Sequence, residues 1–470
     1  MERAEVYEII RKTAEEITPK LIDYRHDFHK YAEGGWLEIR TGSLIARRLY
    51  EMGYEVLIGG AVMKPDVRMN LYSEEFFEKE YERAIGQDAD PEFAPYMKYG
   101  MTGVIGILRG GQREPSPRVL TTAEEAHKDM ENDIAPVIGM RFDIDALGIP
   151  ESTDPEHQPV KCGYASVNDG FMHACGHDSH ACIGLGTAEI LMKIRDELKG
   201  TVKLIFQPHE EGVAGAAEAI VANGHLDKAM YLISSHSTKQ INEPDDAVLY
   251  PGVHGMLATS KWGVVMHGRS AHAGGSPEKG HDALLATATC ILEMNAIPRH
   301  SGGISRVGVG KVRDDSVINA ISDEVHFDFE VRGQTNEICQ YMERKAKLVL
   351  EHAAAMHECT YDLVRKGGGE NFTSSEGLMK RVRRVCEQDL GMKLTEIDSM
   401  KGSGSEDVSY MINKVISNGG EGTFMRILTD IEDIAHSRSY NINDEKLLTN
   451  GAEAFAGVVY DICAEKGDTL

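Results

Sequence analysis

HACGHDSHACIGLGTAEILMK (173–193) joins a cluster of histidine, cysteine and aspartate residues to an apolar stretch with the length and composition of a helix. Short apolar runs typical of strands lie on both sides of this segment, and helical patterns separate them. The predicted strands are 103–108, 136–142, 202–207 and 230–234, and the predicted helices include 4–32, 38–52 and 214–223. Strands that alternate with helices predict an α/β fold with a mainly parallel sheet covered on both faces. In such a sheet, ligands bind beyond the carboxyl ends of the strands.

The segment 256–368 follows a different order of elements. The pattern there predicts strand 260–267, helix 280–296, strands 305–312 and 323–332, helix 335–356 and strand 359–365. This β-α-β-β-α-β order is that of a ferredoxin-like domain. The triple glycine 367–369 that follows has the composition of a flexible hinge. We therefore predict a large α/β domain, residues 1–255 and 369–470, interrupted by a smaller inserted domain, residues 256–368.

The composition disfavours several classes of protein. Lysine and arginine total 50 against 75 acidic residues, and the resulting net charge of −25 disfavours binding to nucleic acid or to an anionic membrane surface. No run approaches the roughly 20 consecutive apolar residues of a membrane helix, and the charged start lacks a signal-peptide pattern, so we expect a cytoplasmic protein. The 8 cysteines form no CxxC pair, which disfavours a disulfide framework.

The acidic stretch 121–135 is expected to be a solvated surface excursion.

Cys175 and His177 are the first candidates for metal ligands. They lie two residues apart in a turn before the predicted helix, and a thiolate and an imidazole are suitable ligands for a zinc-type ion. Asp178 is placed to fix the tautomer of a ligating histidine through a hydrogen bond. A plainer alternative stays open, in which Cys175 is a small core residue and the histidines cap the helix.

A second candidate group follows the predicted strand 202–207, in the sequence FQPHEEG (206–212). Adjacent carboxylates point in different directions, so one member of the pair Glu210 and Glu211 can bind a metal while the other acts as a base. The alternative interpretation is an ordinary solvated acidic turn.

Three further histidines, His236, His272 and His436, lie at predicted strand ends or turns. A single histidine in such a place is usually an ordinary polar residue. Several candidates, however, fall together at the carboxyl ends of strands of one predicted parallel sheet, so the fold places them on one edge. The residues that share this placement are Cys175, His177, Glu211 and His236.

Taken together, these segments resemble a known family of enzymes. They are similar to the aminoacylase, hippurate hydrolase and indole-acetyl-amino-acid hydrolase family of dinuclear metalloamidohydrolases. The resemblance rests on MHACGHDSHACIGLG (172–186), FQPHEEG (206–212), His236, GRSAHAGGSPEKGHDAL (268–284), GSED (404–407) and AHS (435–437), with RHDFHKYAEGGW (25–36) and RFDIDAL (141–147) extending it over nearly the whole chain. The segment 55–105 and the run NAIPRHSGGISRVGVG (295–310) resemble most the subgroup that hydrolyses p-aminobenzoyl-glutamate.

The resemblance implies a zinc-exopeptidase-like catalytic domain and a set of roles for the candidates. It implies two bound divalent ions, Mn or Zn, with the Cys175 thiolate bridging them. Glu210 is implied as the general base and acid, which takes a proton from the attacking water and returns it to the leaving amine. His272 is implied to polarise the scissile carbonyl or to hold its oxyanion. The implied metal ligands are Cys175, His177, Glu211, His236 and His436.

The resemblance also implies two substrate contacts and an assembly. Asn319 in SVINA (316–320) and Arg332 in FEVRG (329–333) match substrate-binding positions, and an arginine suits the free carboxylate of an N-acyl amino acid. In relatives the histidine that matches His272 reaches the site of the neighbouring subunit. The inserted domain 256–368 is therefore implied to serve dimerisation or to act as a lid.

The chain departs from the family pattern at three places. His209 and Phe142 stand where relatives have alanine, and His236 is followed by Ser-Thr-Lys rather than by a proline-rich turn. All five implied ligands and the base are present, so these departures bear on substrate specificity more than on the reaction.

We therefore expect a metal-dependent hydrolase that cleaves the amide of an N-acyl amino acid, in the first place an aroyl-glutamate such as p-aminobenzoyl-glutamate. The enzyme is expected to work as a homodimer or with a homologous subunit. Two alternatives stay open. One is a weakly active or non-catalytic subunit of a heteromeric amidohydrolase, and the other is a structural zinc protein that uses Cys175, His177 and His180.

Overall fold

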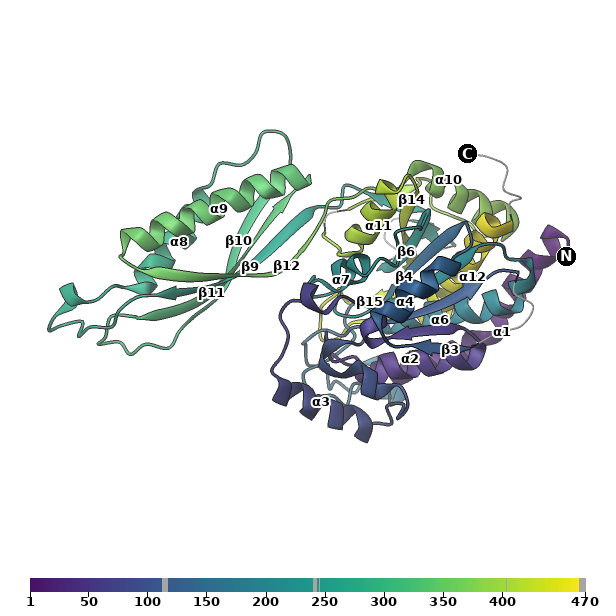
Figure 1. The fold of residues 1–470 in the computed structure, drawn as a ribbon, viewed down its shortest axis with the longest axis horizontal. Helices are drawn as coiled ribbons and strands as arrows, with labels where there is room; N and C mark the ends of the chain where they lie inside the picture. Colours follow the sequence, from purple (N-terminus) through teal and green to yellow (C-terminus); the bar gives the residue numbers. More distant parts are fainter. Residues whose placement is uncertain (112–116, 240–242, 245, 403, 465–470) are drawn as a thin grey trace. The chain divides into compact units, whose positions relative to one another are not determined.

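The computed structural model describes residues 1–111, 117–239, 243–244, 246–402 and 404–464. The chain forms two compact units (Figure 1). Unit 1 contains residues 1–254, 373–401 and 410–470, and unit 2 contains residues 255–372 and 402–409. Within the described ranges, no helix is both long and apolar enough to cross a membrane.

Unit 1 is built on a sheet of eight strands. In spatial order they are β3 (Arg118–Leu120), β1 (Glu55–Ile58), β2 (Val104–Arg109), β5 (Thr201–Gln207), β4 (Val137–Asp143), β6 (Tyr231–Lys239), β14 (Glu421–Thr429) and β7 (Leu249–Tyr250). The central strands β5, β4, β6 and β14 run parallel to one another, whereas β2 and β7 are antiparallel to their neighbours. Every residue of β4 and β5 is buried, as expected for parallel strands that are covered on both faces.

Helices pack on this sheet (Figure 1). The helices outside the inserted segment are α1 (Arg3–Lys30), α2 (Ile39–Met52), α3 (Glu74–Gly86), α4 (Ala123–Asp129), α5 (Gln158–Cys162), α6 (His177–Lys193), α7 (Ala216–Ala222), α10 (Glu376–Arg384), α11 (Val408–Ser417) and α12 (Asp444–Ala464). Two short strand pairs complete the regular structure, β8 (Gly252–His254) with β13 (Ser399–Lys401) and β15 (Ile431–Glu432) with β16 (Asn441–Ile442). The helices α1, α6 and α12 pack against one another.

Two glycines allow α6 to pack closely against its neighbours. A Cβ atom at Gly184 would lie 2.6 Å from the ring of Phe206 on β5, and one at Gly186 would lie 2.7 Å from the side chain of Leu21 on α1. Larger residues at these positions would push α6 away from the sheet and from α1. Gly184 and Gly186 thus set the position of α6, the helix whose first turn contains His177 and His180.

The acidic stretch 121–135 is partly structural. Asp129 and Asp133 have almost fully buried carboxylates that hold Arg109, at 2.7 and 3.1 Å from its Nη2 atom. Asp133 also lies 2.6 Å from the Nζ atom of Lys203, which is buried on β5. The expectation of a solvated excursion is wrong for these two residues, because two buried cations of the sheet need them as partners.

Glu453 on α12 gives a test of the packing between this helix and α1. The residue is buried, and burial raises the pKa of its carboxyl to about 7, with a smaller opposing effect of Arg11. Because the folded protein prefers the neutral acid, ionisation of Glu453 destabilises it increasingly from pH 4.5 to above 7. We expect Glu453→Gln to stabilise the protein by on the order of 2 kcal/mol at pH 8 and by little at pH 5. Thermal melts of both proteins at the two pH values check this, and an equal difference at both values would contradict it.

Unit 2 contains one antiparallel sheet in the order β10 (Ser305–Asp314), β11 (Glu324–Gly333), β9 (Ala258–His267) and β12 (Thr360–Gly369). The helices α8 (Ala283–Ala296) and α9 (Asn336–Met356) pack together and against this sheet. Burial alternates along β11, whose inward residues form the core with both helices. The element order and the strand order are those of a ferredoxin-like domain. The predicted fold class, an α/β unit with a mainly parallel central sheet and an inserted β-α-β-β-α-β unit, is confirmed.

Candidate metal centre

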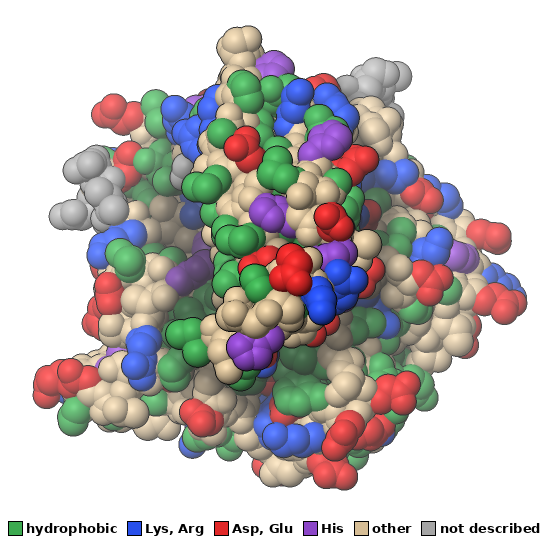
Figure 2. All heavy atoms as spheres, turned by 90° about the vertical axis from the view of Figure 1, so that its left-hand side faces the viewer, with side chains coloured by type: hydrophobic (Ala, Val, Ile, Leu, Met, Phe, Trp, Pro, Cys, Tyr) green, Lys and Arg blue, Asp and Glu red, His purple; other side chains and the backbone are tan. Residues whose placement is uncertain are grey.

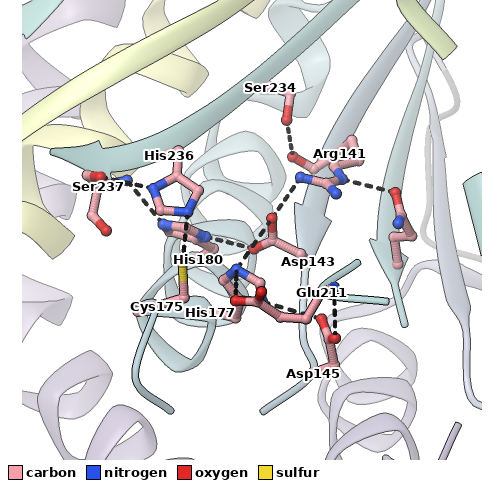
Figure 3. A network of polar contacts seen from close by, with 12 residues as sticks. Arg141, Asp143, Asp145, Cys175, His177, His180, Glu211, Ser234, His236 and Ser237 are labelled. Carbon is pink, nitrogen blue, oxygen red and sulfur yellow. Dashed lines mark hydrogen bonds and ion pairs between the residues drawn. The ribbon is translucent and has the colours of Figure 1, made fainter. Parts of the chain in front are cut away.

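The candidate site lies at the carboxyl ends of three neighbouring strands of unit 1 (Figure 3). β4 ends at Asp143, and Asp145 follows it closely. β5 ends at Gln207 and leads into the turn 208–213, and β6 carries His236 in its second half. The topology of the sheet therefore gathers polar side chains that are far apart in the sequence.

The turn before α6 brings Cys175 and His177 to the same edge. Gly176, the residue that precedes the helix, has a φ of 86°, and a Cβ atom there would lie 2.9 Å from Oγ of Ser237 on β6. The close approach of the turn to β6 therefore requires glycine. No side-chain hydrogen bond caps α6 in the part of the chain that the structure describes, so the alternative of histidines that cap this helix is not observed.

Donor atoms of the five implied ligands converge at this edge. Cys175 Sγ lies 3.3 Å from His236 Nε2. Glu211 Oε1 lies 3.8 Å from His177 Nε2 and 3.5 Å from His436 Nε2. Within each of four groups the possible ligand atoms lie no more than 4.8 Å from one another, as a shared ion requires. The groups are Cys175, His177 and His236; Asp143, His177 and His180; Cys175, Glu211 and His436; and His177, Glu210 and Glu211.

Hydrogen bonds orient the two buried histidines of the cluster. His177 Nδ1 lies 3.1 Å from Asp145 Oδ1, and His236 Nδ1 lies 2.7 Å from the carbonyl oxygen of Ser237. Each Nδ1 therefore donates a proton to its acceptor, so in the neutral form of each ring the lone pair is on Nε2. Asp145 also accepts the backbone N–H of Glu211 through Oδ2, at 3.1 Å, so one carboxylate positions two of the implied ligands.

Asp178 does not have the role that its place in the sequence predicts. Its Oδ2 atom accepts hydrogen bonds from Arg25 Nε at 2.9 Å and from His29 Nδ1 at 2.8 Å. Asp178 thus anchors the start of α6 to α1, and Asp145 fixes the tautomer of His177. The prediction that Asp178 orients a ligating histidine is therefore wrong. Asp178 is next to His177 in the sequence, but on a helix adjacent side chains point in different directions.

His180 is held on both ring nitrogens. Its Nδ1 atom forms a short hydrogen bond with Asp143, and its Nε2 atom accepts the backbone N–H of Ser237 at 3.0 Å. A histidine with both nitrogens engaged has no lone pair for a metal. This geometry argues against a structural zinc site made of Cys175, His177 and His180.

The electrostatics of the cluster suit a cation. Burial lowers the pKa of His236 well below its usual value, with a further contribution from Arg426, so the ring is neutral and able to ligate. Burial also acts to lower the pKa of His177, but Asp143 and Asp145 outweigh it and raise that pKa well above its usual value. His177 Nε2 and Glu211 Oε1 are buried atoms without a hydrogen bond among the described residues. A bound divalent ion would satisfy both atoms, so the residues fit a metal centre.

Glu210 is buried beside these ligands and shares a group with His177 and Glu211. It lies in the turn 208–213, in which His209 and Val213 have φ values of 47° and 44°. Both are non-glycine residues in the left-handed region, which is uncommon and is found often at functional sites. The turn therefore holds Glu210 in a constrained position at the edge of the cluster.

Unit 2 contains the other three predicted site residues, at two separate places. His272 and Asn319 are close, because the N–H of Ala273 donates to the carbonyl oxygen of Asn319 at 3.0 Å. His272 Nδ1 accepts the N–H groups of Gly274 and Gly275 at 3.1 and 3.0 Å. The proton of its ring is therefore on Nε2, which is the donor that a carbonyl oxygen or an oxyanion needs.

Arg332 lies elsewhere in unit 2. It pairs with Thr259 near the end of β11, whereas Glu324 at the other end of this strand pairs with His267. Eight residues separate Glu324 from Arg332, which corresponds to roughly 26 Å at about 3.3 Å per residue. Arg332 is engaged with Glu330 of the same strand, at 3.0 and 3.2 Å. Unit 2 therefore brings His272 and Asn319 together and keeps Arg332 apart from them.

Asp143 and Asp145 belong to the site, although the sequence motifs did not assign them to it. Both lie in RFDIDAL (141–147), at and just after the end of the buried strand β4, and their carboxylates are buried. Two acidic residues at the end of an apolar strand are a signal that could have identified them, because buried carboxylates require partners.

Comparisons with known proteins agree with this geometry. The model of the peptidase family M20/M25/M40 matches residues 139–461. The chain is 33% identical to a subunit of p-aminobenzoyl-glutamate hydrolase of Escherichia coli over 96% of this chain and 97% of that protein. It is 32% identical to indole-3-acetyl-aspartic acid hydrolase of Enterobacter agglomerans over 95% and 97% of the two chains. The crystal structure of an aminobenzoyl-glutamate utilization protein from Klebsiella pneumoniae superposes with a TM-score of 0.78, at 31% identity, over 96% of this chain and 98% of that chain. The chain therefore belongs to the peptidase family M20/M25/M40, and it is an amidohydrolase that acts on linear amides.

Proposed function

We propose that this enzyme uses two divalent ions to hydrolyse the amide bond of N-acyl amino acids, with an aroyl-glutamate such as p-aminobenzoyl-glutamate as the preferred substrate. The observation that carries the proposal is the convergence of a thiol, three imidazoles and a carboxylate at one edge of the sheet, with Glu210 beside them. Support for the substrate class comes from the relatives, which are named for aminobenzoyl-glutamate and indole-3-acetyl-aspartate. Both compounds are amides of an acidic amino acid.

The residues that would hold the ions are Cys175, His177, Glu211, His236 and His436. Cys175 shares one ligand group with His177 and His236 and another with Glu211 and His436. Its thiolate would therefore be able to serve both ions, as the family resemblance implies. The mixture of sulfur, nitrogen and oxygen donors suits Zn or Mn. When bound, such ions lower the pKa of a water molecule toward neutrality and polarise a carbonyl oxygen.

Glu210 transfers the proton in this proposal. Its carboxylate takes a proton from the attacking water as the new carbon–oxygen bond forms. It then returns that proton to the nitrogen of the leaving amino acid as the carbon–nitrogen bond breaks. Glu211 is held by Asp145 and ligates, so the adjacent carboxylates divide the two tasks.

His272 and Arg332 support a dimeric enzyme. His272 carries its proton on Nε2 and can donate it to a carbonyl oxygen, and Arg332 suits the carboxylate of the amino acid. Along β11, Arg332 lies roughly 26 Å from Glu324, the end of the strand from which the chain continues toward Asn319 and His272. This exceeds the length of such a substrate, so in this proposal the two residues come from two chains. We therefore propose a homodimer in which His272 and Asn319 of one chain complete the site of the other.

Exposed hydrophobic side chains on unit 2 agree with an assembly of this kind. Figure 2 shows such side chains on unit 2 among histidine and charged side chains. Val317 and Ile318, next to Asn319, are exposed, and so are Leu284, Leu285 and Leu292 of α8. Burial of hydrophobic side chains of this kind drives most protein association.

We expect His272→Ala to lower kcat roughly 10²-fold to 10³-fold, the usual effect of removing one oxyanion donor, and to leave the bound metal unchanged. Steady-state hydrolysis and metal analysis of the same sample check this. His267→Ala is the matched control, because His267 is a half-buried histidine at the end of β9 that pairs with Asp362 and has no place in the proposed site.

Mixing two inactive variants tests the shared site directly. If His272 acts across the dimer, His272→Ala and Glu210→Gln chains that exchange subunits form mixed dimers with one intact site, and about a quarter of the wild-type activity returns. An active wild type whose mixed variants stay inactive after exchange would rule out the composite site.

A second candidate function is that of a chain that needs a related partner chain, since one relative is named as one subunit of a hydrolase. The purified single chain, assayed against p-aminobenzoyl-glutamate, hippurate and an N-acetyl amino acid, separates the two. Fastest cleavage of p-aminobenzoyl-glutamate supports the proposal. Absence of cleavage of all three by chains with bound metal supports the partner-dependent function.

A further inference from the structure

The turn that carries Glu210 needs support from outside itself. Pro208 has no backbone N–H, and His209 and Val213 both adopt left-handed conformations that non-glycine residues rarely take. Within the turn, the N–H of Val213 donates to the carbonyl oxygen of Glu210 at 2.7 Å. Strained backbone of this kind persists only where the surroundings hold it.

Two buried carboxylates hold this turn, one on each side of Glu210. Oε1 of Glu38 accepts the N–H of His209 at 2.9 Å, and Oδ2 of Asp145 accepts the N–H of Glu211 at 3.1 Å. The residues directly before and after Glu210 are thus each fixed by a backbone hydrogen bond to a buried carboxyl oxygen. Asp145 belongs to the metal centre through His177, whereas Glu38 contacts none of the proposed ligands in any hydrogen bond of the described residues.

Glu38 is itself fixed in place. Its side chain is fully buried at the residue that precedes α2, and Oε2 accepts the hydroxyl of Thr102 at 2.6 Å. Two residues earlier, the ring of Trp36 packs edge-on against the ring of His209, with centroids 4.9 Å apart. Burial raises the pKa of Glu38, and the nearby Asp145 raises it further. A carboxyl group kept in such an unfavourable place needs the hydrogen bonds that it accepts.

We propose that Glu38 is a positioning residue for catalysis, which sets the place of the Glu210 carboxylate by holding the N–H of His209. The inference rests on the proposed role of Glu210 as the proton-transfer group. A general base must lie within hydrogen-bond reach of the proton that it moves, so a displacement of about 1 Å slows the reaction strongly. Substrate affinity and metal binding depend on other residues and are left unchanged.

The test compares three variants of the metal-loaded enzyme. Glu38→Ala removes the acceptor of the His209 N–H, and we expect kcat to fall roughly 10-fold to 100-fold while KM and the metal content per chain stay within twofold of wild type. Glu38→Gln keeps an oxygen that accepts this N–H and an amide that can donate to Thr102, and we expect it to retain at least a third of the wild-type kcat. The difference between these two variants isolates the hydrogen bond.

Glu33→Ala is the control for loss of stability. Glu33 is a buried carboxylate five residues before Glu38, and it accepts the N–H groups of Arg40 and Thr41 at the start of α2. It has no hydrogen bond to the turn 208–213 among the described residues. We expect Glu33→Ala to lower the melting temperature at least as much as Glu38→Ala and to leave kcat within twofold of wild type.

Three results would overturn the role of Glu38. They are a wild-type kcat in Glu38→Ala, a loss of metal that accounts for its loss of activity, and an equal loss of kcat in Glu33→Ala. Failure of the proposed function looks different, because then wild-type enzyme with bound metal cleaves no amide, or Glu210→Gln remains active.

Discussion

Glu210→Gln is expected to lower kcat by a factor of roughly 10² to 10⁴, the usual contribution of a general acid and base, while the protein keeps its metal. Glutamine has the shape of glutamate and cannot take a proton from the attacking water. The turn 208–213 is held at the backbone of its neighbours by Glu38 and Asp145, so the substitution leaves the turn in place. KM is expected to change little, since Glu210 acts on the reacting atoms.

The measurement is steady-state hydrolysis together with elemental analysis of the same sample. The pH profile adds a readout specific for proton transfer, because the limb of the kcat profile that reports the base should vanish in Glu210→Gln. Retention of more than a tenth of the wild-type kcat by a homogeneous Glu210→Gln sample would show that another group moves the proton.

Cys175→Ala is expected to have a comparable effect for a different reason. Cys175 shares ligand groups with His177 and His236 on one side and with Glu211 and His436 on the other. Removing the shared thiolate leaves each group one donor short. We expect the loss of at least one ion per chain and a fall in kcat of roughly 10³-fold or more, since the chemistry of this centre depends on the ions.

Cys182→Ala is the matched control for this experiment. Cys182 is a fully buried thiol on α6, seven residues after Cys175 and outside the ligand cluster. Its substitution leaves a small cavity and is expected to lower stability by about 1 kcal/mol without loss of metal. If Cys175→Ala retained two ions per chain and full activity, the thiolate would have no place in the metal centre.

The sequence predicts the sheet and most of the cluster because both depend on local patterns. Fully buried parallel strands appear in the sequence as continuous apolar runs. The residues that follow such strands lie at the carboxyl-end edge of the sheet, and this does not depend on how the side chains pack. This is why Cys175, His177, Glu211 and His236 could be placed together before the structure was known. His436 could be placed only through the family resemblance, because it follows β15, a strand of two residues.

Hydrogen-bond partners could not be predicted in the same way. Asp178 is adjacent to His177 in the sequence but points to α1, whereas Asp145 is 32 residues away and contacts the ring. The same holds for Glu38, which is 171 residues from His209. Contacts of this kind depend on how α1, α2 and the sheet pack together. The residues adjacent to each partner in the sequence do not predict that packing.

The separation of Arg332 from His272 also required the structure. The sequence places both in the inserted unit, and the family resemblance assigns both to one substrate. The register of β11 and β9 places Arg332 at one end of this sheet, and the chain leaves the other end toward His272. If both residues contact one substrate, as we propose, they come from two chains.

The most direct test of the dinuclear centre is a titration of the metal-free chain with Mn or Zn, with p-aminobenzoyl-glutamate hydrolysis and bound metal measured at each step. We predict no hydrolysis without metal, two ions bound per chain at saturation, and full activity only as the second ion binds. Hydrolysis that persists in metal-free protein, or a saturated stoichiometry of one ion with full activity, would contradict the dinuclear centre built from Cys175, His177, Glu211, His236 and His436.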